Sequence, residues 1–118
     1  MEMGRQRLPT LPTPILPDRM AGMTQYILLV QGNLKSNSTP EEWEVFFEAA
    51  QESGLFRGGS EIGSRTAVGN TEGAQPTDHI VAYMRFDADD KQQVLDLLRR
   101  HPVIIHGGSA ELCEMPES

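Results

Sequence analysis

The sequence predicts one α+β domain over residues 24–116, with its elements in the order strand, helix, strand, strand, helix, strand. Apolar residues recur at every second position in residues 79–86, which is typical of a strand. They recur three or four positions apart in residues 40–53 and 91–100, which is typical of amphipathic helices. Two strand–helix–strand halves in this order predict a ferredoxin-like sandwich, in which both helices cover one face of an antiparallel sheet.

The first strand and the first helix have clear boundaries. Residues 26–31 form a short apolar run of strand formers, which predicts a central strand buried on both faces. Thr39 and Glu42 predict a capping box at the start of the helix, and Gly54 suits the left-handed conformation that ends it. The apolar stripe between these signals is expected to be core: Trp43, Phe46, Phe47 and Ala50.

Glycine interrupts the segment that follows the first helix. Gly58 and Gly59 predict a bulge, or a site where another group comes close to the backbone. Residues 64–68 are expected to be strand, and residues 69–78 are expected to be a polar loop. The second strand is therefore the least regular element of the prediction.

The third strand, residues 79–86, has two different faces. One face is wholly apolar, and the other mixes apolar bodies with the polar tips of His79, Tyr83 and Arg85. Because a plain solvent face has no such apolar bodies, the mixed face is a candidate for binding a ligand or a second subunit.

The end of the chain is expected to contain the second helix and a last strand. Acidic residues at 87–90 predict the start of the helix, and Pro102 predicts its end. His101 is expected at the helix C-terminus, where the helix dipole favours a cation. Residues 103–115 are expected to close the domain as a final strand or as a broken pair of strands.

Composition limits the possible partners and compartment. The formal net charge is −7, which disfavours binding to nucleic acid and to anionic membrane surfaces. No apolar run approaches the roughly 20 residues that span a bilayer. A single cysteine, Cys113, with six methionines predicts a cytoplasmic protein. Proline-rich residues 1–23 are expected to be a disordered extension, not native if translation starts at an internal methionine.

Five short segments resemble the YCII-related family. They are residues 26–30 (Tyr-Ile-Leu-Leu-Val), 53–59 (Ser-Gly-Leu-Phe-Arg-Gly-Gly), 86–87 (Phe-Asp), 101–102 (His-Pro) and 107–112 (Gly-Gly-Ser-Ala-Glu-Leu). The resemblance covers about residues 24–116 and implies a ferredoxin-like subunit that pairs into a dimeric α/β barrel. It also implies a pocket beside the sheet, and relatives such as muconolactone-isomerase-like and chloromuconolactone-dehalogenating proteins.

The chain departs from both functional signatures of that family. One branch carries a His on the first helix and an Asp near its end, and the corresponding positions are Trp43 and Glu52. Trp43 cannot exchange protons at neutral pH, so this dyad is lost. The other branch carries an Asp-Gly-Pro-Phe loop, which residues 70–76 lack.

Four residues form the candidate site in a pocket between paired sheets. His79 is the predicted acid or base, Arg65 the grip for an anionic ligand, and Tyr83 and Glu111 the orienting groups. His106 is a second histidine expected near the polar face. The alternative for these polar groups is that they pair across a dimer interface.

The resemblance and the mixed face of the third strand together imply a homodimer that binds a small organic molecule, which can be anionic, with isomerase-, lyase- or dehalogenase-like proton chemistry. The rival prediction is a non-catalytic ligand-binding or assembly module that has lost the family's reactive residues. No metal and no cofactor are expected, because no short-spaced cluster of metal ligands and no phosphate-binding glycine motif is present.

Overall fold

A computed structural model describes residues 23–116 of the chain. The elements are β1 (Thr24–Gln31), α2 (Pro40–Ser53), β2 (Phe56–Glu61), the 3₁₀ turn η1 (Thr71–Gly73), β3 (Ile80–Ala88), α3 (Lys91–Leu98), α4 (Pro102–Ile105) and β4 (Ala110–Met115). The extension expected at residues 1–23 lies outside the described residues, except for Met23. Within the described part of the chain, no helix has the length and apolar character needed to cross a membrane.

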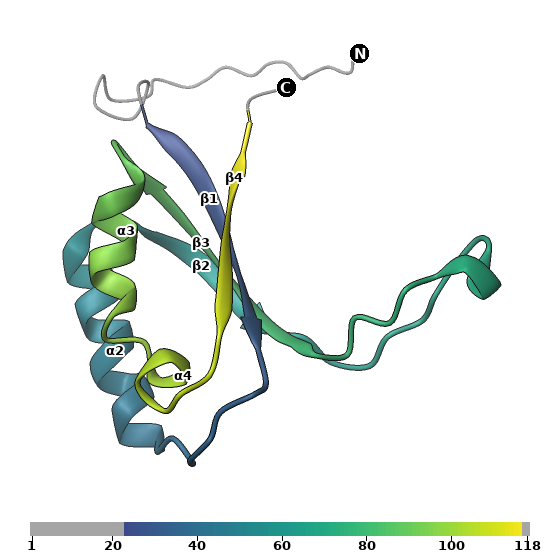
Figure 1. The fold of residues 1–118 in the computed structure, drawn as a ribbon. Coiled ribbons are helices and arrows are strands. Elements are labelled where there is room, and N and C mark those ends of the chain that lie inside the picture. The colour runs from purple at the N-terminus through teal and green to yellow at the C-terminus, as the bar shows by residue number, and fades with distance from the viewer. Residues whose placement is uncertain (1–22, 117–118) are drawn as a thin grey trace.

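The four strands form one antiparallel sheet in the order β2-β3-β1-β4. The helices lie together on one face of this sheet, and the opposite face carries none of the helices in residues 23–116 (Figure 1). The predicted α+β class with an antiparallel sheet is therefore confirmed, and the arrangement is compatible with a ferredoxin-like fold. Strand β1 lies between β3 and β4, so its predicted central position is also confirmed.

The core lies between the helices and the inner face of the sheet. Alternate residues of β1 and β3 point into it, because side chains of a strand alternate between the two faces. Apolar side chains of α2, α3 and α4 form the other side of the core. The buried apolar residues are Tyr26, Leu28, Val30, Phe46, Ala50, Met84, Phe86, Ala88, Val94, Leu98 and Val103.

Helix α2 begins and ends where the sequence predicts. The Thr39 hydroxyl accepts from the backbone N–H of Glu42 at 3.2 Å, and the Glu42 carboxylate accepts from the backbone N–H of Thr39 at 2.8 Å. These two bonds complete the capping box. At the other end, Gly54 adopts a left-handed conformation with φ 76°.

The glycines of β2 permit a close approach between strands. The pairing of β2 with β3 shifts register between Phe56 and Gly58, as the predicted bulge requires. A Cβ atom at Gly59 would lie 2.3 Å from the carbonyl oxygen of Tyr83. Only glycine fits there without moving the backbone of β3.

The prediction of a strand at residues 64–68 is wrong. Residues 62–79 instead leave the sheet as a long arm that carries η1 and returns to β3 (Figure 1). The backbone N–H of Ile62 makes the last backbone–backbone hydrogen bond to β3, at 2.9 Å from the carbonyl of Val81. Strand propensity alone does not hold residues 64–68 in a sheet, because no neighbouring strand pairs with them.

The expectation for the chain end needs two corrections. Helix α3 ends at Leu98, and His101 is not its C-terminal cap but the N-cap of the short helix α4. The final strand begins only at Ala110, because α4 and a glycine turn occupy residues 102–109. Proline at the first position of a helix is favourable, so His-Pro begins a new helix here rather than only ending the previous one.

Candidate functional site

A pocket of about 450 Å³ lies on the helix-covered side of the sheet. Its walls come from α2, β2, β3 and the start of α4, and most of the residues that form it are apolar or aromatic. They are Val30, Leu34, Ser38, Trp43, Phe47, Phe56, Gly59, Ser60, Glu61, Val81, Ala82, Tyr83, Met84, His101 and Val103. A concave site of this size with a few polar groups suits a small organic ligand.

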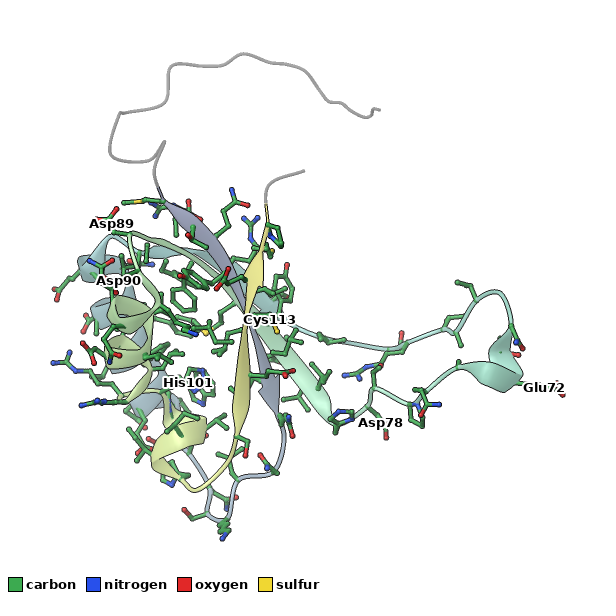
Figure 2. All side chains as sticks on the ribbon, turned by 45° about the horizontal axis from the view of Figure 1, so that its top comes forward. Glu72, Asp78, Asp89, Asp90, His101 and Cys113 are labelled. Atoms are coloured by element: carbon green, nitrogen blue, oxygen red, sulfur yellow. The ribbon has the colours of Figure 1, made fainter. Side chains whose placement is uncertain are left out.

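His101 is the buried polar residue of this pocket, and Figure 2 shows it on the helix side of the sheet. Its Nδ1 accepts a hydrogen bond from the backbone N–H of Val103 at 3.2 Å. The ring lies edge-on to Trp43 and Phe46, with centroid distances of 5.0 and 4.8 Å. The backbone and two aromatic rings therefore fix the imidazole in one orientation.

The protonation of His101 follows from these contacts. Burial lowers its pKa from 6.5 to about 4, so the ring is neutral at neutral pH. Because Nδ1 accepts, the single ring proton lies on Nε2. In the part of the chain that the structure describes, Nε2 is a buried side-chain atom without a hydrogen-bond partner. His101 is thus a fixed neutral donor rather than a proton shuttle.

Trp43 is held at the pocket by its own hydrogen bond. The indole Nε1–H donates to the hydroxyl of Ser38 at 3.0 Å. Both residues line the pocket, so the bond joins the loop before α2 to the aromatic wall. Trp43 therefore forms part of the apolar wall of the pocket, beside His101.

The predicted site residues are not gathered in one place. Tyr83 lines the pocket, whereas His79, Arg65 and Glu111 are exposed and do not. The guanidinium of Arg65 donates to the backbone carbonyls of Thr77 and Ile80, in the turn that carries His79. Figure 2 shows that Asp78 and Glu72 lie along the arm, away from His101.

Tyr83 and Glu111 are separated by a strand. Both pair with Leu29 of β1, one from each side. Adjacent strands are about 4.8 Å apart, so these two residues lie two strand spacings from each other. His79 and Arg65 thus share one end of β3, while Tyr83 and Glu111 flank the middle of β1.

A second polar cluster joins the loop before α2 to the turn before β4. The Ser36 hydroxyl lies 2.7 Å from Nδ1 of His106, and Nε2 of His106 lies 2.9 Å from both carboxylate oxygens of Glu42. Hydrogen bonds from the Thr39 backbone and then from His106 hold the pKa of Glu42 below its ordinary value. The sequence indicated His106 as a candidate but gave no sign of Ser36.

His101 is the pocket residue whose place the sequence did not predict, since it was expected only at a helix C-terminus. Its signal is the His-Pro pair between two apolar segments, which fits an N-cap followed by proline at the first helical position. Its burial depends on α2 packing across it, which no local pattern indicates. Within residues 23–116, no three His, Cys, Asp or Glu side chains come together in a way that could hold a metal ion.

Comparisons with known proteins identify one structural neighbour and no family. No protein-family model matches the chain, and a search of curated proteins finds no match. Among solved structures, the chain is similar to one described as "Crystal structure of PH0061", with 14% sequence identity and a TM-score of 0.48. The match covers 89% of this chain and 60% of that one. These comparisons name no family for the chain.

Proposed function

We propose that the chain binds a small, largely apolar organic molecule in the pocket between α2 and the sheet. The observation that carries this proposal is a pocket of about 450 Å³ whose aromatic walls enclose one neutral, buried histidine. A ligand with a hydrogen-bond acceptor could satisfy Nε2 of His101, while its apolar part contacts Trp43 and Phe47.

Filling the pocket tests this proposal. Ala82 lines the pocket, so Ala82→Leu reduces its volume, whereas Val45 is exposed on α2 and lies outside the lining. We expect anilinonaphthalene sulfonate to bind with saturable fluorescence and to quench Trp43, the single tryptophan of the chain. Ala82→Leu should weaken this binding about tenfold or more, which corresponds to about 1.4 kcal/mol.

Val45→Leu is the matched control and should bind the dye as the wild type does. If Ala82→Leu, verified as folded by circular dichroism, binds the dye with unchanged affinity, the dye occupies another surface. That result would remove the support for the pocket as the ligand site.

We further propose that the chain is a YCII-like subunit with the ferredoxin-like topology, and that two copies pair through the helix-free face of the sheet. Support comes from the strand order β2-β3-β1-β4 and from the segments that resemble the family. The helix-free face also carries half-buried apolar residues at its centre, among them Ile27, Leu29 and Cys113.

Two versions of this function differ in whether the protein is an enzyme. The catalytic version keeps His79 as acid or base, with Arg65, Tyr83 and Glu111 binding an anionic ligand. The non-catalytic version is favoured by Trp43 and His101, because the first cannot exchange protons and the second is neutral near pH 7.

A substitution at His79 separates the two versions. For a catalyst, His79→Ala should reduce turnover of a lactone substrate by about a hundredfold, the usual contribution of an acid or base. For a binding protein, neither turnover nor ligand affinity should change. Lactone isomerisation followed by absorbance, together with dye binding by fluorescence, provides both measurements.

A further inference from the structure

The cluster of Ser36, His106 and Glu42 has the connectivity of a nucleophile, a base and an orienting acid. Ser36 Oγ is 2.7 Å from one ring nitrogen of His106, and the Glu42 carboxylate is 2.9 Å from the other. A clasp between α2 and the turn before β4 would need only the hydrogen bond between His106 and Glu42. The additional bond to a serine hydroxyl is the feature that suggests chemistry.

The directions of these hydrogen bonds follow from the groups present. Glu42 is held ionised by its contacts, so its oxygens only accept hydrogen bonds. Nε2 of His106 must therefore carry a proton and donate a hydrogen bond to Glu42. In the neutral ring Nδ1 then has a lone pair, which accepts a hydrogen bond from the Ser36 hydroxyl. This polarity prepares a serine oxygen for attack.

The surrounding backbone holds the three groups in place. The backbone N–H of Lys35 donates to the carbonyl of His106 at 2.8 Å, and the backbone N–H of Ser109 donates to the side chain of Asn33 at 2.8 Å. The capping box fixes Glu42 at the start of α2. The base is therefore preorganised, while Ser36 itself is exposed and accessible to a substrate.

We propose that Ser36 is a nucleophile for small carboxylic esters, with His106 as its base and Glu42 as the positioning residue. Ser36 Oγ forms a bond to the ester carbonyl carbon, and its proton passes to Nδ1 of His106. The carbon–oxygen bond to the alcohol then breaks, and the alcohol leaves with that proton. Water, deprotonated by the same nitrogen, releases the carboxylic acid and restores Ser36.

Backbone donors lie next to the proposed nucleophile. Within residues 23–116, the backbone N–H groups of Ser36 and Asn37 make no hydrogen bond to another backbone group. Such groups can stabilise the oxyanion that forms when the carbonyl is attacked. The proposal does not depend on the pocket beside α2, since Ser36 does not line it.

Covalent labelling by a fluorophosphonate tests the nucleophile directly. Ser36 Oγ should form a bond to phosphorus as fluoride leaves, and intact-mass and peptide mass spectrometry should locate one adduct on Ser36. We expect Ser36→Ala to abolish the adduct and His106→Gln to slow labelling at least about a hundredfold. Ser64→Ala, at another exposed serine, should be labelled at the wild-type rate.

A comparison of two variants separates the positioning role of Glu42 from its capping role. Glu42→Gln keeps an acceptor for the capping box but removes the negative charge, whereas Thr39→Ala weakens the capping box and keeps the Glu42 carboxylate beside His106. We expect Glu42→Gln to slow labelling at least about tenfold, and Thr39→Ala, which retains the carboxylate, to slow it less than Glu42→Gln does.

The labelling rate measured on folded protein gives a readout that a merely structural role of Glu42 would not change. The charged side chains beside His106 and its turn are Glu42 from α2 and Lys35, whose methylene groups lie over Gly107. The negative charge of Glu42 stabilises the imidazolium that forms when Nδ1 takes the serine proton, so Glu42→Gln should slow labelling while its circular dichroism stays that of the wild type. The proposal is overturned if no adduct forms on Ser36, or if His106→Gln is labelled as fast as the wild type.

Discussion

At the scale of single residues, the environment of His101 decides its chemistry. Trp43 and Phe46 lie against the ring and the Val103 backbone N–H occupies one nitrogen, so water cannot stabilise a charged imidazolium. The same residue type has a different role at position 106, where a carboxylate lies 2.9 Å away. Residue type alone therefore does not predict whether a histidine titrates, donates or accepts.

The low pKa of His101 predicts a dependence of stability on pH. The pKa is 6.5 in the unfolded chain and about 4 in the folded protein, so the unfolded state binds more protons between these values. The free energy of unfolding should be highest above about pH 6.5 and should fall as the pH is lowered toward 4. The full loss from this residue is about 3 kcal/mol.

His101→Asn tests this expectation, because asparagine keeps an N-cap acceptor but does not titrate. Urea unfolding at several values between pH 4 and 6.5 should show a shallower slope for His101→Asn than for the wild type. His79→Asn, at an exposed position, should keep the wild-type slope. Equal slopes for His101→Asn and the wild type would show that burial of His101 does not cause the acid sensitivity.

At the scale of elements, α2 organises both sites. It supplies Trp43 and Phe47 to the pocket, and its first turn supplies Glu42 to the cluster with His106. The capping box that fixes where the helix begins also fixes the position of that carboxylate. Local sequence signals therefore set part of the functional geometry.

Loss of the cap should lower stability by a measurable amount. Thr39→Ala removes the hydroxyl that accepts from the backbone N–H of Glu42, so we expect the free energy of unfolding to fall by about 1 kcal/mol. Thr66→Ala, at an exposed position in the arm, should change it by less than about 0.5 kcal/mol. Equal effects of the two substitutions in chemical denaturation would contradict a stabilising role for the capping box.

At the scale of the whole molecule, the helices of the described residues cover only one face of the sheet. The helices bury the inner face, while the middle of the outer face has apolar side chains bordered by polar ones such as Arg85 and Glu111. Burial of such a face against a second copy would stabilise a chain of this length. The dimer proposal therefore concerns the outer face and leaves the pocket within one subunit.

A charge at the centre of the outer face should separate the subunits. Leu29 is half-buried there, and Leu29→Glu would bury an unpaired carboxylate in the proposed interface. Light scattering at micromolar concentration should give twice the chain mass for the wild type and the chain mass for Leu29→Glu. Leu95→Glu, at an exposed position on α3, should remain a dimer. A monomeric wild type would contradict the proposal.

The sequence by itself determined the features whose causes are local. Thr39, Glu42 and Gly54 fixed the ends of α2, because caps act within one helical turn. The alternation of apolar residues in β3 identified the face that packs into the core. Gly59 indicated a close approach to the backbone, and the carbonyl of Tyr83 is the group that lies there. Each of these depends on neighbouring residues or on a period that the sequence displays.

The tertiary structure alone decided what depends on partners distant in the chain. Residues 64–68 have strand propensity but meet no partner strand, so they belong to the arm. His101 became a buried donor because α2 packs over it, and His106 met Ser36 and Glu42, 70 and 64 positions away, because two turns lie together. A sequence displays propensity and period, whereas burial and convergence arise only when the chain has folded.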